Sequence, residues 1–188
     1  MRSVEPIWED EWVSIFAKYF RERKERDYVL FMTGVYIGLR VSDILPLRVS
    51  HIENTHLVIY EQKTGKLKRI ILHPHLQRIL KDYTAGMKRT DLLFPSRNRD
   101  RRGRLKPIGR KRAYEIIKEA AVTLEYEGNL GTHSMRKTFG IRYYRQYKDV
   151  AELKQIFNHT SEEETYRYLG ILRERIESNI TAIKDVRV

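Results

Sequence analysis

The sequence contains no cysteine, which excludes disulfide bonds, cysteine-ligated zinc sites and thiol nucleophiles. No apolar run approaches the roughly 20 residues that a membrane-spanning helix needs. The first ten residues are mixed and acidic, whereas a secretory signal is basic and then apolar. These absences predict a protein of the cell interior without a membrane partner. Any catalysis must use a nucleophile other than cysteine.

Acidic residues are in the minority, because 37 Lys and Arg stand against 25 Asp and Glu, for a net charge of +12. A chain with this charge repels itself unless it meets a polyanion, and nucleic acid is the commonest polyanion. Ribosomal proteins and proteins of anionic membrane surfaces are also basic, so charge alone does not identify the partner. The length, 188 residues, is that of one domain.

The positive charge is concentrated between residues 97 and 112, which hold nine basic residues and one acid, Asp100. Gly103, Pro107 and Gly109 in the same stretch predict a loop that leads into a helix. A loop this dense in like charges repels itself when no anion is near, which favours DNA contact over a solvated tip. The predicted DNA-binding residues are Arg97, Arg99, Arg101, Arg102, Arg104, Lys106, Arg110, Lys111 and Arg112.

The hydrophobic pattern predicts a mainly helical α+β fold with one small antiparallel sheet. Between residues 56 and 72 the chain becomes β-branched and alternating around Gly65, as is typical of a hairpin. Ser42 is a candidate N-cap for a short helix through Leu47. Helical periodicity is found at residues 8 to 24, 28 to 39, 74 to 85, 110 to 124, 133 to 147, 149 to 157 and 172 to 184, with a short segment at 162 to 168.

Four short segments follow one another in a characteristic order. They are Gly38-Leu39-Arg40-Val41-Ser42-Asp43, Glu61-Gln62-Lys63-Thr64-Gly65, Thr132-His133-Ser134-Met135-Arg136-Lys137-Thr138-Phe139, and Asn158-His159 followed by Thr165-Tyr166-Arg167-Tyr168. In order and spacing these segments resemble the tyrosine recombinases of the phage integrase family. The resemblance covers roughly residues 28 to 172 and implies the fold of the recombinase catalytic domain.

The resemblance also implies a DNA-strand transferase that uses neither a metal ion nor another cofactor. In the family, two arginines hold the phosphate, a histidine is the general base, a lysine is the general acid, a second histidine donates to the phosphate and a tyrosine attacks it. Lys66 and Lys68 lie close enough to Lys63 to compete for the acid's role. The matching residues, in chain order, are Arg40, Lys63, His133, Arg136, His159 and Tyr168.

The chemistry explains why these residue types are needed. Transfer of a phosphodiester to a tyrosine places negative charge on two non-bridging oxygens, which paired guanidiniums can stabilise. A lone arginine is most often a surface cation. Arg40, however, follows a buried apolar run, and Arg136 lies one helical turn after His133, where an idle charge would be unfavourable.

The nucleophile must be chosen between Tyr166 and Tyr168, which face different directions on a helix. Tyr168 lies nine residues after His159, as in the family. The glycine that commonly precedes this histidine is replaced by Asn158, which is acceptable where the backbone needs a positive φ. The three acidic residues at 162 to 164 are an unusual feature next to a DNA site.

We expect residues 1 to 188 to form a single catalytic domain, with a helical lead-in at 1 to 25 and without the family's usual N-terminal core-binding domain. By resemblance, the helix at 172 to 188 is exchanged between protomers, although its apolar stripe would equally suit packing on its own domain. The expected partners are double-stranded DNA and further copies of the chain in a tetrameric synapse. The expected location is the cytoplasm, at the nucleoid, for a bacterial, archaeal or phage-encoded protein.

Two alternative functions stay open at this point. One is a catalytically silent DNA-binding regulator built on the same fold, against which the retention of all six catalytic residue types argues. The other is a DNA-relaxing enzyme similar to type IB topoisomerases, which share the chemistry but not the synapsis.

Overall fold

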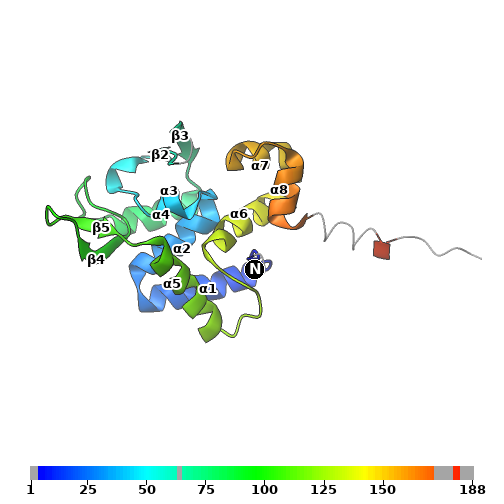
Figure 1. Cartoon of the computed structure of the whole chain (residues 1–188), viewed down its shortest axis with the longest axis horizontal. Helices are drawn as coiled ribbons and strands as arrows, with labels where there is room; N and C mark the ends of the chain where they lie inside the picture. Colours follow the sequence, from blue (N-terminus) through cyan, green and yellow to red (C-terminus); the bar gives the residue numbers. More distant parts are fainter. Residues whose placement is uncertain (1–3, 63–64, 172–179, 183–188) are drawn as a thin grey trace, which may run out of the picture. The chain divides into compact units, whose positions relative to one another are not determined.

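The computed structural model describes residues 4–62, 65–171 and 180–182. The chain divides into two compact units, Met1–Phe139 and Gly140–Val188, and the division falls inside helix α6. Figure 1 shows the elements of both units. None of the described helices is long and apolar enough to cross a membrane.

The first unit begins with two helices, α1 (Asp10–Arg23) and α2 (Glu25–Ile37), which pack on each other. The buried rings of Phe16 and Phe20 on α1 lie 5.9 and 5.2 Å from that of Phe31 on α2. Burial of such rings is the largest favourable contribution that single side chains make to a core. Both helices are confirmed close to the positions that the apolar spacing predicted.

The turn after α2 leads to the short helix α3 (Val41–Ile44). Gly38 ends α2 in the left-handed conformation, with φ of 61°. The predicted N-cap, Ser42, is wrong, because Ser42 lies inside α3. The backbone carbonyl of Arg40 already accepts the N–H groups of Asp43 and Ile44, so Arg40 is the N-cap, two residues before Ser42, and it makes no side-chain cap hydrogen bond.

A three-stranded antiparallel sheet follows the short 3-10 helix η1 (Val49–His51). Its strands are β1 (Ile52–Glu53), β2 (His56–Tyr60) and β3 (Leu67–Ile71), in the order β1-β2-β3. Leu57 and Ile59 point from β2 into the core, whereas Tyr60 and Ile71 lie on the exposed face. The predicted hairpin is confirmed, and helix α4 (Pro74–Tyr83) comes after it.

The basic stretch is a second hairpin and not the predicted irregular loop. Strands β4 (Pro95–Arg99) and β5 (Leu105–Pro107) pair in an antiparallel, two-stranded sheet before helix α5 (Arg110–Thr123). The chain therefore has two small sheets where one was expected. The sequence pattern did not reveal these strands because Leu105 and two prolines are their only apolar residues, so no apolar alternation marks them.

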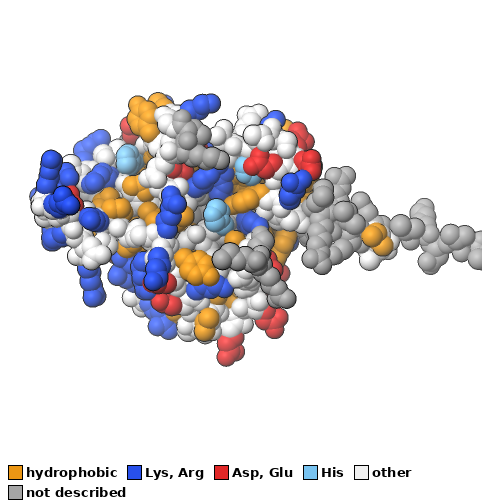
Figure 2. All heavy atoms as spheres, in the orientation of Figure 1, with side chains coloured by type: hydrophobic (Ala, Val, Ile, Leu, Met, Phe, Trp, Pro, Cys, Tyr) orange, Lys and Arg blue, Asp and Glu red, His pale blue; other side chains and the backbone are white. Residues whose placement is uncertain are grey.

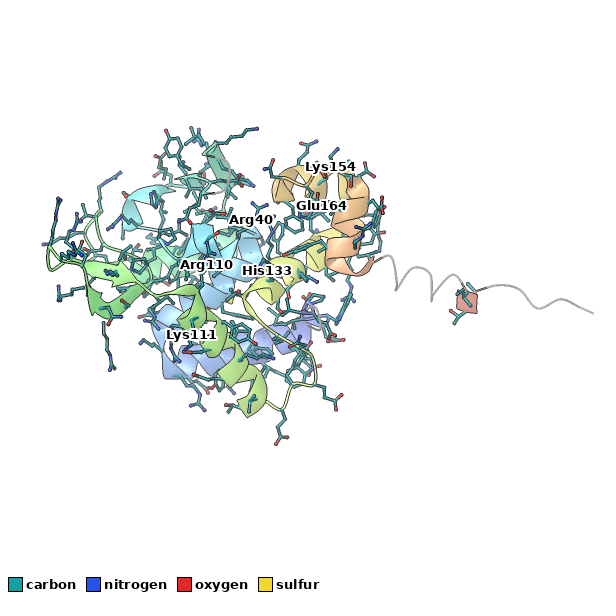
Figure 3. The ribbon with its side chains drawn as sticks, in the orientation of Figure 1. Arg40, Arg110, Lys111, His133, Lys154 and Glu164 are labelled. Carbon is teal, nitrogen blue, oxygen red and sulfur yellow. The ribbon has the colours of Figure 1, made fainter. Side chains whose placement is uncertain are left out.

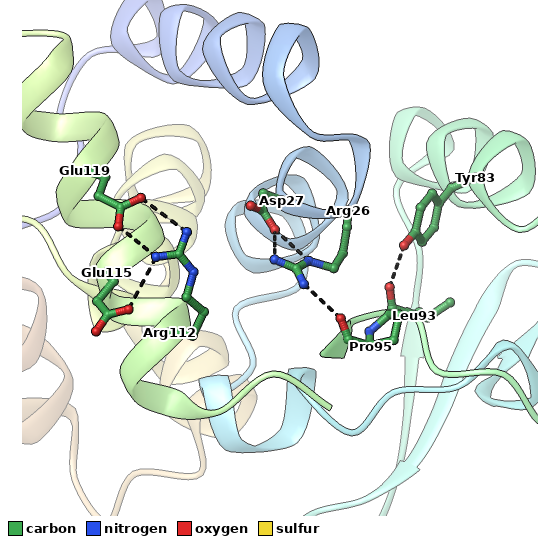
Figure 4. A network of polar contacts seen from close by, with 8 residues as sticks. All are labelled: Arg26, Asp27, Tyr83, Leu93, Pro95, Arg112, Glu115 and Glu119. Atoms are coloured by element: carbon green, nitrogen blue, oxygen red, sulfur yellow. Dashed lines mark hydrogen bonds and ion pairs between the residues drawn. The ribbon is translucent and has the colours of Figure 1, made fainter. Parts of the chain in front are cut away.

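The base of the second hairpin is anchored to the core. Arg26, at the start of α2, donates to the carbonyl oxygen of Pro95 over 2.8 Å and forms a partly buried ion pair with Asp27 (Figure 4). The hydroxyl of Tyr83 donates to the carbonyl oxygen of Leu93 over 2.7 Å. Residues 93 to 95 are thereby held on α2 and α4, and this fixes the start of β4.

The second unit contains the end of α6 (Thr132–Tyr147), helix α7 (Val150–Phe157) and helix α8 (Glu162–Leu169). Gly140 allows α6 to approach Phe157 and Leu169, whose side chains would clash with any Cβ at that position. These three helices are confirmed as predicted. The last predicted helix, at 172 to 184, falls largely outside the described residues.

Candidate active site and DNA-binding surface

Arg136 is fixed inside the first unit. Its side chain lies on α6 and is only 3% exposed, and its Nη1 donates to the carbonyl oxygen of Gly38 over 2.7 Å. Gly38 belongs to the turn that presents Arg40 two residues later. The same turn therefore positions Arg40 through its backbone and binds Arg136 through the carbonyl group of Gly38.

Arg40 and Arg136 act on the same neighbouring side chains. The surrounding protein desolvates His133 and lowers its pKa, and the positive charges of Arg136, Lys137 and Arg40 lower it further. The imidazole is therefore neutral at pH 7, as a general base must be. Figure 3 labels Arg40 ahead of α3 and His133 in the first turn of α6. The structure thus brings together three of the six predicted catalytic residues, Arg40, His133 and Arg136.

Lys63, the predicted general acid, lies outside the described residues, but the strands that flank it are described. The N–H of Glu61 donates to the carbonyl oxygen of Lys66, and the N–H of Gly65 donates to that of Glu61. These bonds close the β2–β3 hairpin around the segment that contains Lys63.

Lys68, one of the two competing lysines, is partly buried on β3. Its Nζ lies 3.3 Å from a carboxylate oxygen of Glu61. Burial lowers the pKa of Lys68 most, the Glu61 carboxylate raises it, and Arg136 and Arg40 lower it. Lys68 therefore belongs to the neighbourhood of the two arginines, with Glu61 as its counter-ion.

Two buried carboxylates, Asp43 and Glu61, received no role from the sequence. Asp43 is 3% exposed, and its Oδ1 accepts the backbone N–H of Gln62 over 2.9 Å, which ties α3 to the end of β2. A charged residue within the apolar run 41 to 47 was the signal that could have revealed Asp43. Within the described part of the chain, no three His, Asp or Glu side chains form a cluster suited to a metal ion.

His159 and Tyr168 lie together in the second unit. Asn158 ends α7 with φ of 51°, which confirms that this position needs the left-handed conformation that asparagine tolerates. The Nδ1 of His159 lies 3.0 Å from the hydroxyl of Thr165 on α8. The ring of Tyr168 packs edge-on at 5.2 Å from the imidazole of His159 and at 5.6 Å from the ring of Phe157.

Two other tyrosines of this unit have different partners. Tyr166 packs edge-on against Tyr144, with 6.3 Å between the ring centroids. The hydroxyl of Tyr143 donates to the carboxylate of Glu152, and this bond raises the pKa of Tyr143 to about 12. A hydroxyl that loses its proton so reluctantly is a poor nucleophile. These contacts leave Tyr168 as the tyrosine that lies beside His159.

The acidic residues at 162 to 164 stabilise the start of α8. Ser161 accepts the backbone N–H of Glu164, while the Glu164 carboxylate accepts the backbone N–H and the hydroxyl of Thr160. This reciprocal arrangement resembles a capping box, and negative charge is favourable at a helix N-terminus. The unusual acidic run therefore has a structural role next to His159.

All nine basic residues between 97 and 112 are exposed, and three of them have protein partners. Arg104 pairs with Asp100, Arg99 donates to the carbonyl oxygen of Gly103, and Arg112 pairs with two carboxylates of α5 (Figure 4). Figure 2 shows blue side chains gathered over β4 and β5. The other six cations of the stretch have neither an ion pair nor a side-chain hydrogen bond within the described residues, namely Arg97, Arg101, Arg102, Lys106, Arg110 and Lys111.

Comparison with known sequences gives the family. Residues 7–175 match the model of the phage integrase family. The chain is 42% identical over 173 residues to the probable integrase/recombinase YoeC of Bacillus subtilis, covering 91% of this chain and 92% of YoeC. It is 27% identical over 167 residues to the tyrosine recombinase XerC of Caldanaerobacter subterraneus, covering 83% of this chain but only 45% of XerC.

Solved structures of recombinases share the fold. The XerA recombinase aligns with a TM-score of 0.72 at 18% identity, over 97% of this chain and 68% of XerA. The XerH recombinase, in a post-cleavage complex with its palindromic difH substrate, aligns with a TM-score of 0.71 at 18% identity, over 97% of this chain and 54% of XerH. The chain belongs to the phage integrase family of tyrosine recombinases.

Proposed function

We propose that this chain cuts and rejoins double-stranded DNA at specific sites through a 3′-phosphotyrosyl intermediate formed by Tyr168. The observation that carries the proposal is the group formed by Arg40, His133 and Arg136 in the first unit. Two guanidiniums beside a neutral imidazole carry a net positive charge that favours the binding of an anion. A DNA phosphate is such an anion.

Arg40 and Arg136 bind the two non-bridging oxygens of the scissile phosphate. The bond from Arg136 to Gly38 holds its guanidinium against the turn that presents Arg40. Because the arginines are in place before the negative charge develops, they stabilise the transition state with little reorganisation.

His133 removes the proton from the hydroxyl of Tyr168 as the tyrosine oxygen attacks the phosphorus. Lys63 donates a proton to the leaving 5′ oxygen, and His159 donates a hydrogen bond to the phosphate. One P–O bond forms as another breaks, so the bond energy is conserved in the phosphotyrosine. A 5′-hydroxyl from a partner strand then reverses the step, and the cycle needs neither a metal ion nor a nucleotide.

The two compact units form one catalytic domain in this proposal. Copies of the domain assemble on DNA as a tetrameric synapse in which the segment 172 to 188 is exchanged between protomers. Deleting this segment abolishes assembly but leaves the binding of one copy to DNA intact. The enzyme acts on DNA in the cytoplasm, at the nucleoid.

The β4–β5 hairpin and the start of α5 bind the phosphate backbone without regard to sequence. Support comes from the six exposed cations whose side chains have no hydrogen bond or ion pair within the described residues, Arg97, Arg101, Arg102, Lys106, Arg110 and Lys111. Such contacts contribute affinity and register but no sequence selection.

The test is incubation of the chain with a DNA duplex nicked beside the cleavage position, in EDTA, followed by denaturing electrophoresis. Cleavage beside the nick frees a short fragment that carries the 5′-hydroxyl, and this fragment dissociates. The reaction then cannot reverse, so a covalent protein–DNA adduct should accumulate. A strand added with its own 5′-hydroxyl should then be joined to the DNA held in the adduct. The absence of any adduct would favour a silent DNA-binding regulator. Relaxation of supercoils without strand exchange would favour a topoisomerase.

A further inference from the structure

The turn between β4 and β5 is organised by one carboxylate. Oδ1 of Asp100 accepts the backbone N–H groups of Arg102 and Arg104, over 2.8 and 2.9 Å. Oδ2 accepts Nε and Nη2 of Arg104, each over 2.9 Å. The backbone N–H of Asp100 also donates to the carbonyl oxygen of Arg104. The one acid in the basic stretch therefore binds the backbone of the residues that follow it.

The other side of the turn is fixed by Gly103. Its φ is 74°, and its N–H donates to the carbonyl oxygen of Asp100 over 3.0 Å. The guanidinium of Arg99 donates to the carbonyl oxygen of Gly103 over 2.6 Å. Arg99 and Arg104 are thus engaged in holding the turn, whereas Arg101 and Arg102 are exposed at its tip.

The Asp100 carboxylate is suited to stay charged in this position. The backbone N–H of Arg104 lowers the pKa of Asp100 most, with further lowering from the Arg104 side chain and the backbone N–H of Arg102. The carboxylate therefore accepts these bonds throughout the neutral range.

We propose that Asp100 is a positioning residue for DNA binding, because it holds the turn so that Arg101 and Arg102 face the phosphate backbone in a fixed arrangement. A turn of consecutive arginines would otherwise repel itself and would have to be ordered on binding, which weakens association. The inference rests on the proposed role of the hairpin in DNA binding.

Charge alone predicts the opposite effect of removing Asp100, since the loss of an acid from a basic surface should strengthen DNA binding. Asp100→Asn and Asp100→Ala separate the two effects, because both variants have the same net charge. The asparagine oxygen can still accept the backbone N–H groups of Arg102 and Arg104, whereas alanine has no acceptor.

The experiment measures the affinity of the full chain for an unrelated duplex at several salt concentrations. Asp100→Ala should bind about tenfold more weakly than Asp100→Asn, with a salt slope smaller by about 0.9 for each phosphate that the variant no longer neutralises. Gly103→Ala, which keeps every charge but strains a residue with φ of 74°, should also bind more weakly than the wild type. Unfolding transitions like that of the wild type would show that the domain itself is intact.

Equal affinities for Asp100→Asn and Asp100→Ala, both above that of the wild type, would overturn the inference and leave only a charge effect. The double substitution of Arg101 and Arg102 by alanine tests the underlying role of the hairpin separately. If that variant bound DNA like the wild type, the hairpin would not contact DNA, and the positioning role of Asp100 would fall with it. If the double variant binds DNA more weakly than the wild type, and Asp100→Asn binds more tightly than Asp100→Ala, the results support both the DNA contact of the hairpin and the positioning role of Asp100.

Discussion

The guanidinium of Arg136 donates a 2.7 Å hydrogen bond to the carbonyl oxygen of Gly38, 98 residues earlier in the chain. The ring of Phe139, one turn further along α6, occupies the space that a Cβ on the same glycine would need. The turn that presents Arg40 is therefore packed against α6 at two adjacent groups. Through it, the positions of the two arginines depend on each other.

Replacing Gly38 by alanine should disturb this turn much more than the same change at Gly86. Both glycines have positive φ, 61° and 81°, but a Cβ at Gly86 would have no neighbour within 4 Å. Gly86→Ala should cost about 1–2 kcal/mol of stability, from the left-handed backbone alone. Gly38→Ala should cost about 1–3 kcal/mol more, because the ring of Phe139 must move.

Urea unfolding of the two variants measures the difference, and covalent trapping on nicked DNA measures its effect on the site. Only Gly38→Ala should lose trapping activity under conditions where both variants are folded. Equal losses of stability, with trapping unaffected in both, would show that the packing of Phe139 on Gly38 does not position Arg40.

The pH dependence of His133 follows from its lowered pKa, to which desolvation and the charges of Arg136, Lys137 and Arg40 contribute. An NMR titration of the imidazole should give a midpoint below the ordinary value of 6.5. Since the unfolded chain then binds more protons than the folded chain, stability should fall as the pH drops through 6.5 towards the folded pKa.

His133→Gln serves as the control, because it cannot be protonated and should remove that part of the acid sensitivity. The rate of covalent trapping by the wild type should likewise stay high to below pH 6.5, as long as the imidazole is neutral. A midpoint at or above 6.5 would contradict the electrostatic coupling of His133 to the arginines.

Arg112 and Arg101 should differ in their importance for DNA binding, although both are exposed arginines of the basic stretch. Arg112 bonds to the carboxylates of Glu115 and Glu119 over 3.3 and 2.7 Å, which partly neutralise it. Arg101→Ala should reduce the slope of log K against log salt by about 0.9, whereas Arg112→Ala should change it little. Fluorescence anisotropy at several salt concentrations measures both slopes. Equal decreases of the slope would mean that Arg112 exchanges its two carboxylate partners for DNA phosphates on binding.

Local sequence signals were sufficient for most of the fold. Helical spacing of apolar residues predicted α1 and α4 to α8, and a long, nearly continuous apolar run predicted the buried helix α2. Gly65 marked the turn of the β2–β3 hairpin. The replacement of the family's glycine by Asn158 is acceptable if this position needs a positive φ, and its φ is 51°. The β4–β5 hairpin was missed because its pairing depends on hydrogen bonds made by Asp100 and Gly103, and not on an apolar face.

The candidate site was predicted residue by residue, but its internal contacts were not. Nothing in the sequence pairs Arg136 with Gly38 or Asp43 with the backbone of Gln62, because these contacts join distant segments. The engagement of Arg112, in contrast, was readable from Glu115 three residues later, a spacing at which helical side chains meet. Long-range polar contacts are therefore where the structure adds most to the sequence.

Tyr168 makes the covalent bond to DNA in the proposed mechanism, and its neighbour Tyr166 provides a matched control. Tyr168 packs against the imidazole of His159, whereas Tyr166 packs against Tyr144. Phenylalanine in place of either tyrosine keeps the ring and removes only the hydroxyl, so both variants should fold and bind DNA like the wild type.

Covalent trapping on nicked DNA in EDTA, followed by peptide mapping of the adduct, decides between the two tyrosines. Tyr166→Phe should form the adduct at a rate close to that of the wild type, and the mapped attachment should be at residue 168. Tyr168→Phe should bind the same DNA but give no adduct, because it has lost the attacking oxygen. An adduct formed by Tyr168→Phe and lost in Tyr166→Phe would contradict the account and move the nucleophile to Tyr166.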